Sequence, residues 1–249
     1  MKVLVIGGGH NGLVAAATLA VKGCKVTVLE RRDRFGGVAD GLLHDSETLS
    51  PEVVEELELT SHGLELQDPP PVFVPSSTGS GMLVHRDPNE MTDELGPDLP
   101  AYHEWRAFLA RVLPFARSQV DNQTLDISGT AELMPLMKAG LAFRMMGKKD
   151  IHELLRVGPS CVDDYLIEWF AHQNLRSALA APALHGTFMG PRSPSSTATL
   201  LLHEAQVAQE VVGGPGALVE ALLSACRARG VHLQAEAEVS RIRVEGGRA

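Results

Sequence analysis

A glycine-rich turn near the N-terminus is the part of the sequence best suited to binding chemistry. Residues 7–12 read GGGHNG and Ala16 follows, which gives the pattern G-x-G-x-x-G-x-x-x-A. In such a turn the first glycine (Gly7) permits a tight bend, and the second (Gly9) lets a pyrophosphate approach the backbone. Gly12 and Ala16 let the following helix lie close to the preceding strand. The N-terminus of that helix offers free N–H groups and a positive dipole end to phosphates.

The elements that must position this turn are visible on either side of it. Residues 2–6 predict a strand buried on both faces, residues 10–22 predict a helix, and residues 25–29 predict a second buried strand. This order predicts a βαβ unit with parallel strands. Glu30 ends the second strand near the ~20-residue distance expected of an acid that binds a ribose 2′-hydroxyl. Its carboxylate would repel a 2′-phosphate, which disfavours NADP. An incidental glutamate is the weaker alternative, because the whole structural context is present.

A second glycine pair, Gly36–Gly37, follows Glu30 in the segment RRDRFGG. Simple NAD dehydrogenases do not require it, and it resembles the extended fingerprint of FAD-binding oxidoreductases of the glutathione-reductase-like fold. That resemblance places the Gly–Gly loop beside the phosphates and ribityl chain of the cofactor. It also places Arg31 beside the ribose acid and gives Arg34 a role in neutralising phosphate. A solvated loop is an equally open interpretation of the two arginines.

The segment Val3–Gly37 closely resembles the N-terminus of phytoene-desaturase-like FAD-dependent oxidoreductases, in which a His–Asn pair inside the turn is typical. Later segments resemble the same family, at residues 83–88 (LVHRDP), 184–194, 213–222 and 230–244. The resemblance implies FAD as the cofactor, with Val239 contacting the adenine through its backbone. The cofactor-binding residues expected on these grounds are Gly7, Gly9, His10, Asn11, Gly12, Glu30, Arg31, Gly36, Gly37 and Val239.

The predicted fold class is α/β: a Rossmann-like FAD-binding domain of the glutathione-reductase-like type with an inserted substrate or cap region. The FAD-binding domain is expected to combine residues 1–68 and 211–249, and the inserted region to span 69–210. Relatives of this family continue past the segment that ends this chain, so the predicted FAD-binding domain is C-terminally incomplete. An apolar surface is therefore expected to be exposed, or covered by a second chain.

Patterns elsewhere in the chain predict the remaining elements. A hairpin is expected from strands at 72–74 and 82–85, and helices are expected through the middle of the chain. The C-terminal part is expected to add two helices and two strands. The predicted ranges are helices at 51–59, 101–120, 131–146, 150–156, 160–181, 196–210 and 216–229, and strands at 231–233 and 239–244.

The resemblance implies oxidation of C–H to C=C in a hydrophobic or undefined organic substrate, with hydride transfer to the flavin. Because the cofactor carries the hard chemistry, no dedicated side-chain base is required, and no catalytic residue is assigned. Two alternatives stay open. One is a truncated or split flavoprotein that binds nucleotide or a partner without turnover. The other is an NAD-dependent dehydrogenase, which Gly36–Gly37 disfavours.

Composition excludes several other classes. A net charge of −9 argues against a general nucleic-acid binder. The 3 cysteines have no C-x-x-C spacing, which excludes thiol–disulfide chemistry and favours the cytoplasm. No metal-ligand spacing is present, and no run of ~20 apolar residues predicts a membrane span. Four histidines in family-like segments are candidate acid–base groups or structural residues: His44, His85, His185 and His203.

Two further segments carry alternative interpretations. Residues 133–146 (LMPLMKAGLAFRMM) hold four methionines beside cationic residues. A packed amphipathic helix is favoured there, an apolar substrate channel and peripheral membrane contact being the alternatives. Residues 186–194 (GTFMGPRSP) are expected either to line the substrate cavity or to form a loop punctuated by glycine and proline.

Overall fold

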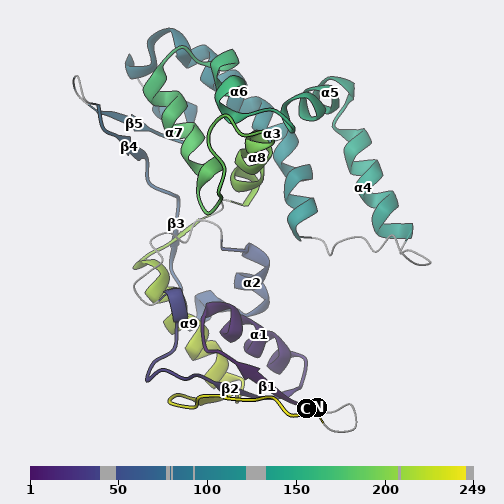
Figure 1. Cartoon of the computed structure of the whole chain (residues 1–249). Helices are drawn as coiled ribbons and strands as arrows, with labels where there is room; N and C mark the ends of the chain where they lie inside the picture. Colours follow the sequence, from purple (N-terminus) through teal and green to yellow (C-terminus); the bar gives the residue numbers. More distant parts are fainter. Residues whose placement is uncertain are drawn as a thin grey trace. The chain divides into compact units, whose positions relative to one another are not determined.

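The computed structural model describes residues 1–39, 49–76, 79, 81–91, 93–121, 133–206 and 209–244. The chain divides into two compact units: Met1–Pro69 with Ala208–Ala249 (unit 1), and Pro70–Val207 (unit 2) (Figure 1). The domain boundaries predicted from the sequence lie within a few residues of these bounds. The assignment of unit 2 to substrate binding stays a prediction.

Unit 1 is built on a parallel sheet in the strand order β1–β2–β7. Two short strands, β3 and β6, pair antiparallel in a separate two-stranded sheet. The predicted βαβ unit is therefore confirmed. The elements are β1 (Lys2–Ile6), α1 (His10–Val21), β2 (Lys25–Leu29), η1 (Gly37–Ala39), α2 (Pro51–Glu56), η2 (Leu59–His62), β3 (Leu66–Gln67), β6 (Glu210–Val211), α9 (Gly214–Ala228) and β7 (His232–Gln234).

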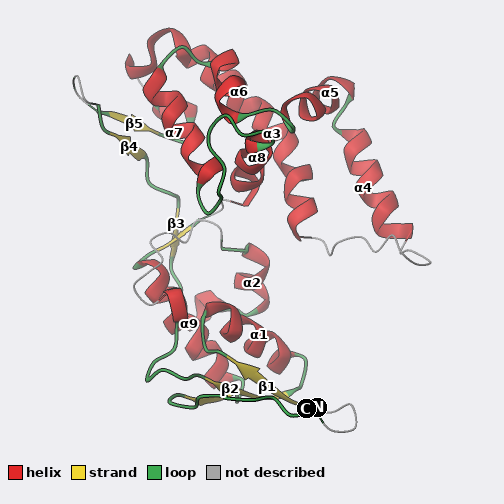
Figure 2. Ribbon diagram, in the orientation of Figure 1, coloured by secondary structure: helices red, strands yellow, loops and turns green. Residues whose placement is uncertain are grey.

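The core of unit 1 lies between the sheet and two helices, α1 and α9 (Figure 2). Small residues allow these helices to approach, since Ala17 of α1 and Ala225 of α9 are fully buried. The buried thiol of Cys226 lies 3.5 Å from the backbone oxygen of Leu13. Burial raises the pKa of this thiol to about 11, so it stays protonated and unreactive at neutral pH.

Within the described residues of unit 1, nothing covers the opposite face of the sheet at β1. Leu4 and Ile6 of β1 are 68% and 54% exposed, although the sequence predicted a strand buried on both faces. Alternation along the strand explains the difference, because Val3 and Val5 face the helices while Leu4 and Ile6 face away. A continuous apolar run cannot reveal which of its faces lacks a cover.

Unit 2 is mainly helical, with one antiparallel hairpin (Figure 2). The hairpin confirms the strands predicted on either side of the Ser/Gly turn. The elements are β4 (Val72–Val74), β5 (Met82–Val84), η3 (Pro88–Glu90), η4 (Asp93–Asp98), α3 (Leu99–Asp121), α4 (Leu133–Met145), α5 (Lys148–Val157), α6 (Val162–Trp169), α7 (Gln173–Leu184) and α8 (Ser196–Gln206).

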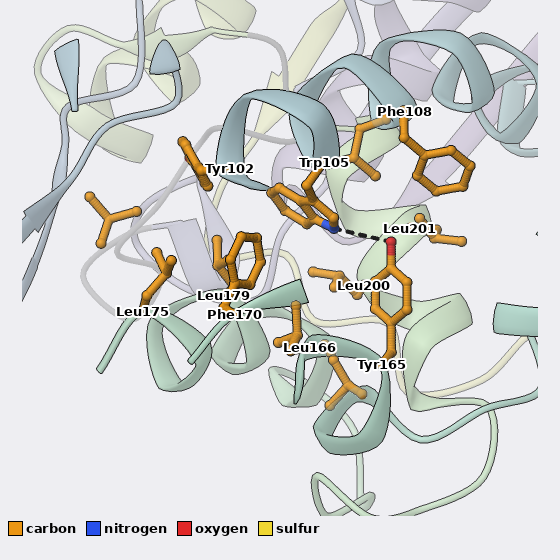
Figure 3. Close-up of a cluster of buried hydrophobic side chains, with 14 of the residues drawn as sticks. Tyr102, Trp105, Phe108, Tyr165, Leu166, Phe170, Leu175, Leu179, Leu200 and Leu201 are labelled. Atoms are coloured by element: carbon orange, nitrogen blue, oxygen red, sulfur yellow. Dashed lines mark hydrogen bonds between the residues drawn. The ribbon is translucent and has the colours of Figure 1, made fainter. Parts of the chain in front are cut away.

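Aromatic side chains from α3, α6 and the α6–α7 junction fill the core of unit 2 (Figure 3). The indole N–H of Trp105 donates to the hydroxyl of Tyr165 at 3.0 Å, and Phe170 packs edge-on against Trp105. Two arginines of the unit, Arg86 and Arg106, both reach the largely buried carboxylate of Glu204. The segment at 83–88 is thereby tied to α3 and α8.

Several predicted elements differ in the structure. The helix predicted at 51–59 ends at Glu56, and the helix predicted at 196–210 ends at Gln206, before the short strand β6. Residues 160–181 form two helices rather than one, since Phe170 is extended and the carboxylate of Asp98 accepts the N–H groups of Ala171 and His172. Residues 239–244 were expected to form a strand but are irregular. In the part of the chain that the structure describes, no strand pairs with them, and a strand without a partner gains no ladder hydrogen bonds.

Candidate functional site

The glycine turn joins β1 to α1 at the carboxyl end of the parallel sheet. Gly7 has φ +99°, a conformation that favours glycine, and its N–H donates to the oxygen of Leu29 at 2.8 Å. Gly9 is the N-cap residue of α1 and makes no side-chain cap, and the first turn carries no acidic residue. The first backbone bond of the helix runs from Leu13 to Gly9. The N–H groups before Leu13 therefore point out of the helix end, where an anion can accept them.

The other glycines of the motif hold the helix close to the strand and the second loop close to the turn. A Cβ on Gly12 would overlap the backbone oxygen of Gly7. Gly37 has φ +61°, and a Cβ on it would come within 3.0 Å of the Cα of Gly9. Gly36, at φ +121°, donates its N–H to Gly8 at 2.9 Å. The glycine turn and the Gly36–Gly37 pair thus lie against each other.

Gly8 and Phe35 were missed by the sequence analysis. The ring of Phe35 occupies the position that a Cβ on Gly8 would need, so only glycine fits beneath it. Gly8 also donates its N–H to Oε2 of Glu30 at 2.7 Å. One signal was available: a single aromatic residue in the otherwise charged segment between Glu30 and Gly36.

Glu30 is buried and ties the turn to the loop that follows β2. Its Oε2 accepts the N–H of Gly8, and its Oε1 accepts the N–H of Arg32 at 2.9 Å. Burial alone raises the pKa of Glu30, but these two N–H groups and the nearby guanidinium groups of Arg32 and Arg31 hold it below its ordinary value. The group is therefore a carboxylate at neutral pH. Each oxygen keeps a free lone pair, which a ribose hydroxyl can use.

A pH dependence follows from this carboxylate. A lowered pKa means that its contribution to stability is full above the ordinary value of 4.5 and is lost as the pH falls through the lower folded-state value. We expect Glu30→Gln to cost about 2 kcal/mol of unfolding free energy at neutral pH, and to flatten the fall in stability between about pH 5 and pH 3. Urea unfolding followed by circular dichroism measures both effects. Glu238→Gln, at an exposed carboxylate, is the control. If the unfolding free energies of wild type and Glu30→Gln fell in parallel as the pH is lowered, the hydrogen bonds of Glu30 to Gly8 and Arg32 would not stabilise the fold as described.

Val239 lies beside Glu30 although the two are far apart in the sequence. The backbone of residues 234–237 bonds to that of residues 30–32, including the N–H of Ala237 to the oxygen of Glu30 at 2.8 Å. A cavity of about 200 Å³ opens there, and Glu30, Arg31, Glu238 and Val239 line it together with Ile6, Gly7, Leu29 and Ala237. This is smaller than the ~300–1,000 Å³ of a site for a whole drug-sized ligand, so it suits one end of a long ligand.

His10 and Asn11 begin α1, at the same helix end as the glycine turn. Asn11 is exposed, whereas His10 is half-buried. The Nδ1 atom of His10 is buried and has no hydrogen-bond partner within the described residues. An orphaned polar atom beside an open helix N-terminus fits a site whose ligand supplies the missing partner. All ten residues predicted to bind the cofactor therefore belong to unit 1 and gather around the carboxyl ends of β1 and β2.

The other candidate residues lie elsewhere. His85 bonds to Glu90 at 2.7 Å, His185 ends α7 and His203 lies in α8, all in unit 2; His44 lies outside the described residues. The loop at 186–194 packs on α6, where the N–H of Asp163 donates to the oxygen of Pro191 at 3.0 Å. Among the described residues, no three histidines, cysteines or acids are placed to hold a metal ion.

Comparison with known proteins supports a dinucleotide-binding domain in unit 1. A model of the NAD(P)-binding Rossmann-like domain matches residues 5–55, which include the glycine turn, Glu30 and the Gly36–Gly37 pair. The chain is 29% identical to pyridine nucleotide-disulfide oxidoreductase domain-containing protein 2 of Rattus norvegicus, over 97% of this chain and 48% of that protein. It is 26% identical to the chloroplastic prolycopene isomerase of Daucus carota, over 99% of this chain and 42% of that protein. The predicted family resemblance is confirmed. The chain spans about half the length of the curated relatives it matches first.

A solved structure of an oxidoreductase from Methanosarcina mazei has a similar fold, with a TM-score of 0.55 at 17% identity. The similarity covers 99% of this chain and 54% of that one. This similarity supports the predicted fold class, a Rossmann-like dinucleotide-binding domain. In the parts of the chain that are described, no helix combines the length and the apolar character that crossing a bilayer requires.

Proposed function

We propose that this chain is the FAD-binding part of an FAD-dependent oxidoreductase. One observation carries the proposal: an open helix N-terminus, the buried carboxylate of Glu30 and the Gly36–Gly37 pair meet at one end of a parallel sheet. FAD supplies hydride-accepting chemistry when it is bound. The residues of this chain supply its position, and no side chain is assigned to a proton transfer.

Each part of a dinucleotide has a group to meet it. The first N–H groups of α1 face the pyrophosphate, and the small Gly9 leaves room for it. The carboxylate of Glu30 accepts the ribose hydroxyls with the lone pairs that Gly8 and Arg32 leave free. The cavity beside Val239 takes the adenine end, as the family resemblance implies.

FAD is favoured over NAD because of the second loop. Gly36 bonds to Gly8, and Gly37 lies against Gly9, so this loop passes directly beside the phosphate position. A cofactor that extends beyond the pyrophosphate can use such a loop. For the reaction, we propose oxidation of C–H to C=C in an apolar organic substrate, on the ground that the family resemblance is to phytoene-desaturase-like proteins.

Cofactor binding tests the proposal directly. We expect the purified protein to carry yellow flavin absorbance, or to take up added FAD with quenching of flavin fluorescence. Calorimetry with NAD under the same conditions should show no binding. A colourless protein that takes up no FAD, or one that binds NAD in its place, would overturn the proposal. If an apolar organic substrate then bleaches the bound flavin, that substrate has transferred hydride to it and the protein acts as an oxidoreductase.

The open sheet face favours one second candidate, a nucleotide-binding subunit that acts only with a partner. Leu4 and Ile6 present an exposed apolar surface next to the cofactor end of β1. A second polypeptide that covers this face would complete the unit. The flavin titration separates the candidates, because such a subunit binds FAD but shows no reduction by substrate until the partner is added.

A further inference from the structure

Helix α4 of unit 2 carries an apolar stripe that nothing covers in the described residues. Met137, Leu141 and Met145 are 60%, 58% and 77% exposed. They are spaced four residues apart and so lie on one side of the helix. Helix α4 lies at the edge of unit 2, where it projects beyond α3 and α5 (Figure 1).

The other side of α4 is already used for packing. The ring of Phe143 lies 5.3 Å from that of Phe115 in α3, and Met146, just after the helix, packs against the core of unit 2. The helix is thus apolar on both sides, with only one of them buried. An ordinary packed amphipathic helix would expose a polar face, so the exposed apolar stripe of α4 differs from that pattern.

The charges around the stripe indicate what kind of surface covers it. Residues 133–149 hold no acidic residue in a chain whose net charge is −9. Arg144 is exposed beside the stripe, and Lys148 and Lys149 are exposed just beyond the end of α4. No acidic residue within the described chain forms an ion pair with these three cations. The neighbouring acid Asp150 is held at 2.7 and 3.2 Å by Arg111.

We propose that α4 docks on a lipid bilayer containing anionic lipids, with the stripe of Met137, Leu141 and Met145 in the interface. Methionine and leucine side chains can enter the acyl boundary, while long cationic side chains reach the headgroups. A second copy of this acidic chain suits the cations less, because it would have to offer a local acidic patch around an apolar groove. The proposal does not depend on FAD or on any reaction.

Co-sedimentation with vesicles tests the docking surface on the whole 249-residue chain. We expect binding to vesicles of phosphatidylcholine with phosphatidylglycerol, weaker binding to phosphatidylcholine alone, and loss of the difference at roughly 0.5 M salt. Replacing Arg144, Lys148 and Lys149 by glutamine should weaken binding roughly a hundredfold. The matched control replaces three exposed lysines of unit 1, Lys2, Lys22 and Lys25, and should bind as the wild type does.

The apolar part of the surface needs its own variants. Serine at Met137, Leu141 and Met145 should reduce binding roughly a hundredfold, since each of these side chains adds apolar area to the interface. Serine at Phe73, Ile167 and Leu202, which are exposed on other elements of unit 2, is the matched control. Equal sedimentation of wild type, the glutamine variant and the α4 serine variant would overturn the proposal.

A second measurement locates the helix in the bilayer without weakening binding. In Leu141→Trp, we expect brominated lipids to quench the added tryptophan fluorescence, whereas Leu202→Trp should gain no quenching. Analytical ultracentrifugation tests the alternative that a second copy of this chain covers the stripe. Self-association that the serine variant at α4 abolishes, together with no vesicle binding, would assign the stripe to a second copy and overturn the membrane proposal.

Discussion

Gly9→Val is expected to give a folded protein that takes up no FAD. The backbone at Gly9 has φ −71° and ψ 170°, which any residue adopts. A Cβ there would meet only Gly37 Cα at 3.7 Å and Gly36 oxygen at 3.9 Å, which are ordinary contacts. A Cβ at this position therefore meets no clash among the described residues. The requirement for glycine arises from the ligand, because a branched side chain would fill the space through which the pyrophosphate reaches the N–H groups of α1.

Flavin fluorescence titration measures the loss of FAD binding, and thermal unfolding of the same sample shows whether the fold is kept. We expect at least a hundredfold loss of FAD affinity (about 3 kcal/mol or more) with a melting temperature close to that of the wild type without cofactor. Gly190→Val is the control, because Gly190 lies in an exposed loop of unit 2 with open space around it. Full flavin occupancy in Gly9→Val would show that the phosphates do not lie at the glycine turn.

The sequence revealed the part of the site that depends on local geometry. Gly7, Gly9, Gly12 and Glu30 follow a spacing that a strand, a turn and a helix impose on one another, so their meeting could be predicted without any tertiary information. Gly8 escaped notice because its requirement comes from the ring of Phe35, which folds back over it from beyond β2.

Features that depend on distant partners were predicted less well. The β-branched residues of the segment 239–244 are typical of a strand, but strand formation also needs a neighbouring edge, which no local pattern reports. The break at Phe170 depends on Asp98, which lies just before α3. Its carboxylate accepts the N–H groups of Ala171 and His172, immediately ahead of α7. Val239 lines a cavity together with Glu30, and no local pattern reports the backbone bonds between residues 234–237 and 30–32 that join the two segments.

Gly12→Ala is expected to have the opposite effect to Gly9→Val: it should destabilise unit 1 directly. The added Cβ would overlap the backbone oxygen of Gly7, and neither backbone can move without opening the α1–β1 contact. Such overpacking costs about 3 kcal/mol, and the better helix propensity of alanine offsets about 1 kcal/mol of it. A net loss of about 2 kcal/mol in the free energy of unfolding is expected.

Cys226 provides a reporter of this loss within unit 1. Its thiol is fully buried against the oxygen of Leu13 in α1, so opening of α1 exposes it. We expect a thiol reagent to label Cys226 roughly thirtyfold faster in Gly12→Ala than in wild type, as read by peptide mass spectrometry, because labelling follows the population of the open state. Labelling of Cys161, in unit 2, should not change in parallel.

Gly140→Ala is the matched control for the substitution itself. Gly140 lies inside α4 with nothing within 4 Å of its Cβ position, so alanine there gains helix propensity without a clash. It should stabilise unit 2 by about 0.5–1 kcal/mol and leave Cys226 labelling unchanged. If Gly12→Ala instead labels as slowly as wild type, α1 tolerates a methyl group at its start. The close helix–strand contact would then not be what selects glycine at the third position of the motif.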